Sequence, residues 1–417
     1  MAAATFSSLG IRNYRVYFAG QSVSLIGTWM QRVAQAWLVL ELTESGTAVG
    51  AVTAIQFLPI LLFAPMGGLL ADRFDKRRIL YTTQSLAAVS ALSLGAVVLV
   101  GVAALWMVYV SALALGLAAA FETPARQTFV QEMVGREHLT NAVSLNSTLV
   151  NAARIIGPAV AGLLIVGVGI AWCFIVNGFS YVALIVALRL MNTAELRQAD
   201  IPPRTPHQLV EGFRYVINTP AVRTPLVLLA VAGLFTYEYA VVLPLFARFT
   251  FGGDARTFAW MSSAMGVGAV LGGLLAATRA NRPPVALART GILFGILQLA
   301  VSQTPTLPLA LLSLAVLGAT SVTFIALGNA TLQLTAAPTM RGRVMGLYVV
   351  AFFGTTPVGA PLMGWVGEHL GPRYALAGGG LALLVAALVV LPRLGSVTLD
   401  ATEMVGPVAE GPPAAKI

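Results

Sequence analysis

The sequence has few charged residues and almost no cysteine. Charged types make up 10% of its 417 residues, whereas a soluble domain averages about 25%. So few charges cannot cover the surface of a water-soluble protein of this size, which excludes cytosolic enzymes, nucleic-acid-binding proteins and disordered proteins. The one cysteine, Cys173, excludes a disulfide framework and any zinc or iron–sulfur site held by cysteines.

The sequence also lacks the motifs of enzymes and metal proteins. It contains no phosphate-binding GxxxxGKS loop, so the chain is not predicted to be an ATP-driven pump. The three histidines, His138, His207 and His369, fall in predicted loops far apart along the chain. We therefore expect no enzymatic activity, no metal site and no cofactor.

Long uncharged apolar runs dominate the sequence. Apolar types make up 58% of the residues and the mean hydropathy is +0.84. Because a helix needs about 20 mostly apolar residues to cross a bilayer, the runs 45–71, 79–121, 155–188, 257–278, 290–340, 344–367 and 374–392 supply ten spans. Two more, at 16–40 and 222–247, hold one charge each, Arg32 and Glu238. The sequence predicts an all-α membrane protein with twelve transmembrane helices.

The distribution of lysine and arginine predicts the orientation of these spans. On the predicted topology, 20 of the 25 basic residues fall on the side of the two termini, three on the other side, and Arg32 and Arg154 within spans. Basic loops stay cytoplasmic, so we expect both termini in the cytoplasm and the positive charge against the inner leaflet rather than nucleic acid. The bias to Ala, Gly, Leu and arginine over lysine favours a bacterial cytoplasmic (inner) membrane.

The chain divides into two similar halves. Residues 1–191 and 221–393 each hold six spans, 192–220 form a cytoplasmic linker with an amphipathic helix, and 394–417 form a tail predicted to be disordered. The sequence GGLLA recurs at 67–71 and 272–276, and the Gly157-Pro158 pair has a counterpart near 357–361. This predicts two pseudo-symmetric six-helix bundles, as in several transporter folds.

Two motifs resemble those of the major facilitator superfamily. The loop between spans two and three has Gly68, then Asp72-Arg73, then a basic cluster that includes Arg77, with Asp75 where the family usually has glycine. The resemblance implies the major facilitator fold and a gate formed by Gly68, Asp72, Arg73 and Arg77.

Span five is similar to the antiporter motif of bacterial drug exporters, at Gly157, Pro158 and Gly162. In those exporters this bend helps to seal the outer side of the protein. The chain as a whole resembles the bacterial branch of the superfamily that exports drugs and siderophores. It departs from the family at Ala112, which stands where span four usually carries an arginine, so the role of that arginine cannot be transferred.

Polar and charged residues inside the spans are the candidates for mechanism. A charge at the bilayer centre costs about 2.5–3.5 kcal/mol on insertion scales and needs a reason. In span one, a polar seam lies on one helix face with Arg32 at its flank, and Ser147, Asn151 and Arg154 form a second seam in span five. The residues of the first seam are Gln21, Ser24, Thr28, Gln31 and Gln35.

Glu238 is the predicted proton-coupling residue, because it is the only acidic residue well inside a span. Two alternatives remain: a structural ion pair of Glu238 with Arg32 or Arg154, and a residue tilted to the membrane interface. Glu122, with Arg126 one turn later, is predicted to form an ion pair at the membrane interface or to be a second proton-coupling site.

Aromatic and amide side chains within the spans are candidates for the wall of a substrate cavity, because such cavities are mostly apolar with a few polar groups. The set comprises Trp29, Tyr237, Tyr239 and Phe324, together with Gln31, Gln35, Asn151 and Asn329.

These observations predict a secondary transporter, a proton-coupled antiporter that exports amphipathic small molecules such as drugs or siderophore-like compounds by alternating access. The expected partners are the substrate, protons and the lipid bilayer, with a monomer as the family's usual state. The alternatives are proton-coupled uptake of a metabolite, a lysophospholipid flippase, and a membrane sensor that transports nothing.

Overall fold

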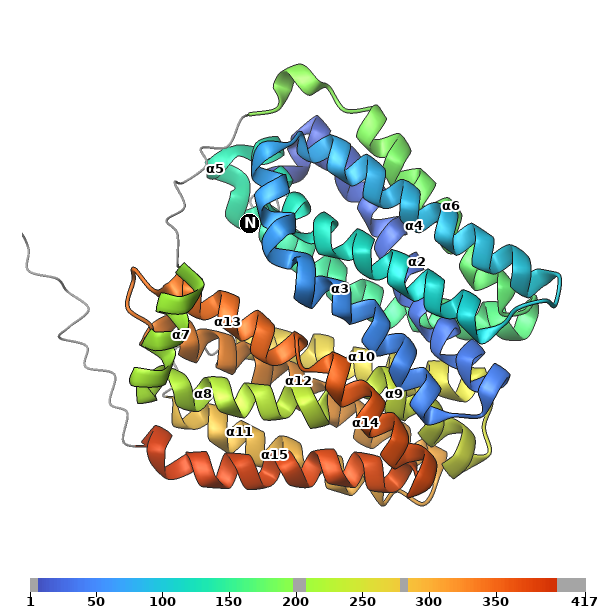
Figure 1. Ribbon diagram of the computed structural model, residues 1–417, viewed down its shortest axis with the longest axis vertical. Helices are drawn as coiled ribbons and strands as arrows, with labels where there is room; N and C mark the ends of the chain where they lie inside the picture. Colours follow the sequence, from blue (N-terminus) through green and yellow to red (C-terminus); the bar gives the residue numbers. More distant parts are fainter. Residues whose placement is uncertain (1–6, 198–207, 278–283, 396–417) are drawn as a thin grey trace, which may run out of the picture.

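The computed structural model describes residues 7–197, 208–277 and 284–395, and that part of the chain contains helices but no strand. The first half comprises η1 (Ser7–Gly10), α2 (Arg12–Thr43), α3 (Gly46–Arg73), α4 (Lys76–Leu99), α5 (Leu105–Gly167) and α6 (Ala171–Arg189). In Figure 1 these helices form the upper bundle. The predicted disorder of the 394–417 tail falls almost entirely outside the described residues.

The second half forms the lower bundle in Figure 1. After η2 (Thr193–Glu195), the amphipathic helix predicted in the linker is α7 (Gln208–Asn218). The remaining elements are α8 (Pro220–Val231), η3 (Ala232–Thr236), α9 (Tyr239–Leu245), η4 (Phe246–Thr250), α10 (Ala255–Ala277), α11 (Val285–Ser302), α12 (Leu307–Thr335), α13 (Arg341–Phe353), α14 (Thr356–His369) and α15 (Pro372–Gly395).

The helices supply twelve spans. Eleven helical segments of the described chain are long and apolar enough to cross a membrane, and α2, with 32 residues, supplies the twelfth, less apolar because it carries the polar seam. The continuous helix α5 holds two spans, which Gly135 separates with a φ of 71°. Glycine is required there because a side chain disfavours a left-handed backbone. The predicted all-α fold of two six-helix bundles is confirmed.

The repeat seen in the sequence is also a repeat in packing. Gly67 of α3 lies against the backbone carbonyl of Ala120 in α5, and Gly272 of α10 lies against the carbonyl of Ala319 in α12. In both places, a Cβ on the glycine would collide with that oxygen. Small residues let membrane helices approach to backbone contact, so the same close pair is built once in each half.

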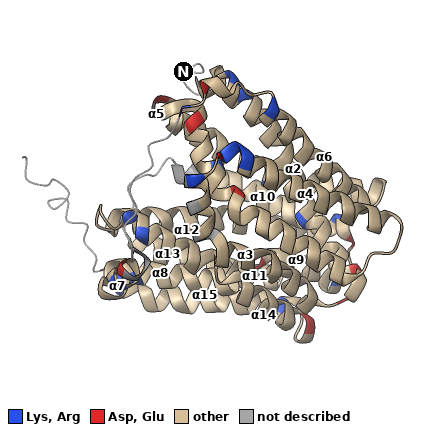
Figure 2. Ribbon diagram, turned by 45° about the horizontal axis from the view of Figure 1, so that its top comes forward, with Lys and Arg blue, Asp and Glu red and all other residues tan. Residues whose placement is uncertain are grey.

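The two ends of the bundles differ in charge. We call the end that holds η1, α7 and the start of α13 the terminal face, and the opposite end the distal face. Figure 2 shows basic residues gathered near the N-terminus and around α7 and α13. Among the described residues, the distal loops and helix ends hold only three basic side chains, Arg248, Arg256 and Arg373.

The turn between α3 and α4 is closed by Asp75, where the superfamily usually has glycine. Its Oδ1 accepts hydrogen bonds from the backbone N–H groups of Arg77 (2.8 Å) and Arg78 (3.4 Å), which makes Asp75 the N-cap of α4. We expect Asp75→Ala to cost about 1 kcal/mol of stability and to lower the melting temperature of the purified protein, with Asp75→Ser close to wild type because serine retains the cap. An unchanged melting temperature in the alanine variant would contradict this role.

Candidate functional site

A polar cavity of about 150 Å³ lies inside the first bundle. The seam predicted on α2 forms one wall, since Gln21, Ser24, Thr28, Gln31 and Gln35 all line the cavity together with Arg32. The other walls carry Gln56 of α3, Gln84 of α4, Glu122, Thr123 and Arg126 of α5, and Tyr181 of α6. The seam therefore faces the interior of a bundle, as the cost of polar groups in lipid requires.

Hydrogen bonds hold this polar wall together but leave part of it unused. Gln31 Oε1 accepts a hydrogen bond from Asn177 Nδ2 at 2.5 Å, and Gln35 Nε2 donates to Gln56 Oε1 at 3.4 Å. Gln21 Oε1, Gln31 Nε2 and Gln84 Oε1 are buried and have no partner. Buried amides without partners are costly, so the cavity has the capacity to bind water or a polar ligand group.

Glu122 and Arg126 form an ion pair with 3.8 Å between carboxylate and guanidinium. The pair predicted from the sequence is present. Both side chains line the polar cavity, and α5 continues for several turns beyond them to Gly135. Glu122 therefore remains a candidate for proton coupling.

A second polar feature joins α2 to α5 at the level of Trp29. The guanidinium of Arg32 lies 4.6 Å from the centre of the Trp29 ring, and that of Arg154 lies 5.1 Å from it. Guanidinium groups at such distances are attracted by the ring quadrupole. The structure thus brings together three residues that the sequence assigned to different roles.

Glu238 lies at a break in span seven. The π-helix η3 ends at Thr236, and Glu238 has a non-helical backbone, with φ −81° and ψ 36°, before α9 begins. The side chain is 3% exposed and its Oε1 has no hydrogen-bond partner. Among the described residues, no lysine or arginine pairs with this carboxyl within 4 Å, so neither Arg32 nor Arg154 is its ion-pair partner in this conformation.

The aromatic candidates of the second half form a cluster rather than a continuous cavity wall. The Tyr237 ring meets Phe352 edge-on at 4.8 Å and Phe294 at 5.4 Å, and its hydroxyl donates to the Ser321 carbonyl. Tyr237 is partly exposed. Phe324 is fully buried against Phe294, so it belongs to the bundle core and not to a cavity wall.

Three further cavity candidates have polar partners of their own. Tyr239 is buried and donates to Gln298 Oε1 at 2.6 Å, which corrects its assignment to a cavity wall in this conformation. Asn329 Oδ1 accepts from Gln333 Nε2, one turn along α12. Asn151 donates to the Ser147 carbonyl at 3.0 Å on α5. Both asparagines are partly exposed.

The two halves meet along a seam of small residues that starts at the distal face. Gly364 of α14 lies against the carbonyl of Gly46 in α3, and Gly50 lies against the carbonyl of Ala360. The Glu368 carboxylate caps the seam by accepting from the Ser45 hydroxyl (2.7 Å) and the Thr47 N–H (2.8 Å).

A second line of contact runs between α5 and α10. Gly162 faces Ala259, whose Cβ would lie 2.7 Å from a Cβ at Gly162, and the Ser263 hydroxyl donates to the Ile155 carbonyl at 3.4 Å. Trp37 of α2 stacks on Phe258 of α10, with 6.4 Å between ring centres. All these contacts lie between the distal face and the middle of the spans.

The antiporter-like motif is split between two packing contacts. Gly157 lies against α2, with the Cβ of Trp29 and the backbone of Ile26 and Met30 as neighbours. Gly162, more than one turn later, faces the other half. Pro158 is buried between them. The motif thus places span five against both α2 and α10.

The signature loop is anchored within the first half. Arg77 Nε donates to the Leu188 carbonyl at 2.8 Å, and Lys76 pairs with Glu132 at 2.7 Å. Arg73 is exposed and Gly68 is half-buried in α3. The side chain of Asp72, the predicted centre of the gate, lies outside the described residues, so the gate remains a prediction.

The sequence analysis missed Gln56, Gln84, Asn177 and Tyr181, which complete the polar cavity or its hydrogen bonds. Gln56 is isolated in an apolar run, and Gln84 lies in the short polar stretch 82–85. Asn177 and Tyr181 are four residues apart, a helical spacing that the sequence analysis did not use. A further signal was available for the three amides. An amide side chain within a span needs a polar partner, and three spans of the first half besides span one each carry an amide.

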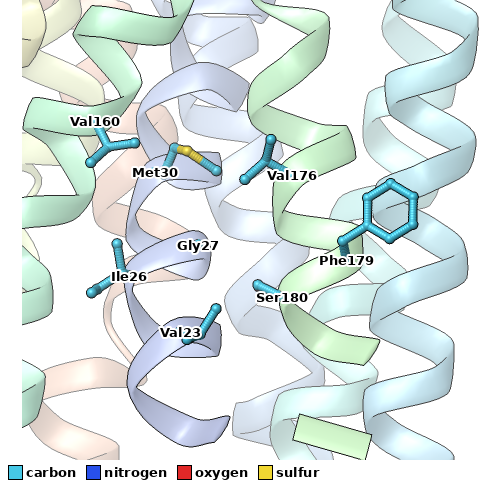
Figure 3. Close-up of a pocket in the computed structure, with 8 residues that line it drawn as sticks. All are labelled: Val23, Ile26, Gly27, Met30, Val160, Val176, Phe179 and Ser180. Atoms are coloured by element: carbon cyan, nitrogen blue, oxygen red, sulfur yellow. The ribbon is translucent and has the colours of Figure 1, made fainter. Parts of the chain in front are cut away.

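A larger hollow of about 370 Å³ is not the candidate site. Figure 3 shows it between α2, α5 and α6, with Val23 and Ile26 from α2, Val160 from α5, and Val176 and Phe179 from α6. Its one polar side chain, Ser180, already donates to Asn177. Val23 and Phe179 are exposed, so the hollow is an apolar groove on the outer surface of the bundle.

Comparison with known proteins decides the family. A family model of the MFS group, described as "Transmembrane secretion effector", matches residues 3–408, which is nearly the whole chain. The chain belongs to the major facilitator superfamily. Its relatives in this superfamily are membrane transporters and not enzymes.

Two relatives of this superfamily member are named exporters. The multidrug efflux pump Tap of Mycolicibacterium fortuitum is 28% identical over 390 residues, covering 89% of this chain and 94% of that protein. The enterobactin exporter EntS of Shigella flexneri is 24% identical over 388 residues, covering 91% and 90%.

The solved structure of a bacterial homologue of the lysosomal transporter Spinster matches this major facilitator protein with a TM-score of 0.69 at 15% identity. It covers 92% of this chain and 94% of its own. At that identity the likeness shows the shared fold alone. The resemblance to the drug and siderophore exporter branch is confirmed by the family model and the two relatives.

Proposed function

We propose that the protein is a proton-coupled antiporter that exports amphipathic small molecules across a bacterial inner membrane. The two bundles would rock about a substrate site at mid-depth and expose it to each side in turn. Both termini and the terminal face would be cytoplasmic, in agreement with the excess of basic residues there. We expect a monomer, the usual state in this superfamily.

One observation supports this proposal above the others. The halves contact each other from the distal face to mid-depth, and the polar cavity of the first half contains amide groups without hydrogen-bond partners. The seam between α3 and α14 uses backbone contacts of glycine and alanine, which close tightly. Among the described residues of this seam, Glu368 supplies the side-chain hydrogen bonds. Such a seam supports a state that is closed at the distal face and open to the cytoplasm, in which α3 and α14 could move apart to open the outer gate. The names of Tap and EntS support export as the direction.

Glu238 is the proposed proton carrier. Glu238 has a hydrogen bond from the Thr356 side chain but no cation within 4 Å among the described residues. An ionised carboxylate without a counter-charge in an apolar interior is strongly disfavoured, so the side chain would take up a proton before it is sealed from water and release it when water returns. Moving one charge through 100 mV provides about 2.3 kcal/mol, enough for roughly a fiftyfold gradient.

The test is transport into everted membrane vesicles of fluorescent amphipathic dyes of both charge types. We expect energised uptake above that of vesicles without the protein, and its collapse on addition of a protonophore. Uptake indifferent to the protonophore would remove proton coupling. Uptake only in right-side-out vesicles would favour the metabolite importer. Movement of labelled lysophospholipid without dye transport would favour the lysophospholipid flippase. Absence of transport of either dye or lipid would favour the membrane sensor.

A further inference from the structure

Two arginines share one aromatic ring in the interior of the membrane-spanning region. Arg32 on α2 and Arg154 on α5 lie 4.6 Å and 5.1 Å from the Trp29 ring centre. Arg32 is 20 residues from the start of α2 at Arg12, and Arg154 lies at a similar depth of its span, which runs from Glu137 to Gly167. Both cations are therefore near the middle of the bilayer, where charge is expensive.

Neither arginine has an anionic partner in the part of the chain that the structure describes. The ion pairs found there use other basic side chains, such as Arg126 with Glu122. Arg154 Nε is buried and has no hydrogen-bond partner. Arg32 is exposed and Arg154 is half-buried. A cation–π contact contributes about 0.5–2 kcal/mol, whereas a charge near the bilayer centre costs about 2.5–3.5 kcal/mol on insertion scales before the two cations repel each other. Trp29 alone does not offset this cost.

The wall opposite these arginines is aromatic. Arg154 is close enough to Tyr237 of the second half to interact with it electrostatically. The Tyr237 ring packs on Phe352, and Phe352 packs on Tyr348 and on the exposed Phe353. The Glu238 carboxyl follows Tyr237 but lies within the second half beside Gly359. Arg154 thus faces an aromatic surface that supplies no counter-charge, while Arg32 also lines the polar cavity, where the Glu122 carboxylate already pairs with Arg126.

We infer that Arg32, Trp29 and Arg154 form the anion-binding part of the substrate site, and that the transported molecule is an organic anion with an apolar, ring-containing body. The guanidinium groups would hold its carboxylate, phenolate or similar group, since their planar donors match such oxygens. The aromatic wall would hold its body. This inference rests on the proposed function, because it specifies the substrate class of the proposed exporter.

Two dyes with the same xanthene core test the inference. Fluorescein is an anion at neutral pH and rhodamine 123 is a cation. We expect purified protein in lipid nanodiscs to bind fluorescein at least about tenfold more tightly than rhodamine 123, as measured by fluorescence anisotropy. Arg32→Gln and Arg154→Gln should each weaken fluorescein binding by about tenfold to a hundredfold, the range for hydrogen bonds to charged groups.

Matched variants separate binding from folding. Arg32→Lys and Arg154→Lys keep the charge without the planar donors and should retain part of the affinity. Arg12→Gln removes an exposed arginine at the start of the same helix and should change nothing. The glutamine variants should keep their melting temperatures, because each removes one unpaired charge. Equal binding of the two dyes, tighter binding of rhodamine 123, no binding of fluorescein, or binding indifferent to both glutamine changes would overturn the inference.

Transport of the same dyes in everted vesicles separates this inference from the proposed function. Selective fluorescein binding that depends on the arginines, without transport of either dye, would leave the anion site and refute export of such molecules. Energised fluorescein uptake that survives both glutamine changes would support the exporter and refute the anion site.

Discussion

Glu238→Gln is expected to abolish uphill transport, with energised uptake in everted vesicles reduced by about tenfold or more. The replacement keeps the shape of the side chain but cannot gain or lose a proton, so the driving force of about 2.3 kcal/mol per charge and 100 mV is no longer coupled to the substrate. Movement of substrate down its own gradient should persist, because the cavity and the seam are unchanged. Both are measured in the same vesicles with and without an imposed proton gradient.

Glu137→Gln is the matched control, since Glu137 is exposed at the terminal face and has no proposed role. Loss of downhill movement together with uphill transport would indicate a structural role for Glu238. Full uphill transport by Glu238→Gln would move the coupling role to Glu122, the other acidic residue at a polar site within the spans.

Gly364→Leu is expected to prevent closure of the distal seam and to reduce transport by about tenfold or more. A Cβ at Gly364 collides with the carbonyl of Gly46. Because the colliding atom belongs to the backbone of α3, it cannot rotate away as a flexible side chain could. The closed state becomes inaccessible, and alternating access needs both states. Transport and surface expression are measured together, so that loss of protein is not taken for loss of function.

The control for this change is Gly378→Leu, because Gly378 lies in α15 with open space around its Cβ position. A reporter cysteine at Gln35 distinguishes the conformations: an impermeant maleimide added on the distal side should label it faster in Gly364→Leu than in the parent. The native Cys173 is buried and gives little background. Unchanged transport and unchanged labelling would show that the seam is not the gate.

Most spans were predictable because the bilayer imposes one simple rule, about 20 apolar residues between polar ends. The boundary between spans four and five was not, since α5 continues through both as one helix from Leu105 to Gly167. The run 290–340 became α11 and α12, and the amphipathic linker segment became α7. The polar seam of α2 was predictable for the same reason, since five polar side chains at helical spacing cannot face lipid.

The break before Glu238 was not predictable. No proline or glycine marks residues 236–238. The π-helix of η3 lies where Gly233 closely approaches the Phe352 carbonyl, a contact with another helix that the local sequence does not reveal. The burial of Phe324 and Tyr239 also depends on which helix face meets which neighbour. In spans that are apolar on every side, hydrophobic periodicity carries no information on that choice.

The halves share a fold but not a chemistry. The first half holds three basic side chains at its polar sites, Arg32, Arg126 and Arg154, against the single acid Glu122. The second half presents Tyr237, Phe352 and their neighbours. A substrate between them would meet charge on one side and rings on the other, so its orientation in the site would be fixed by amphipathicity alone.

The basic residues of the terminal face have a consequence for how its charge responds to pH. Of the 25 basic residues, only Lys76 and Lys416 are lysines and the rest are arginines, whose guanidinium groups stay protonated at any pH a cell survives. In the orientation that we propose, this face lies against the inner leaflet, and its attraction to anionic lipids would not vary with the pH of the cytoplasm.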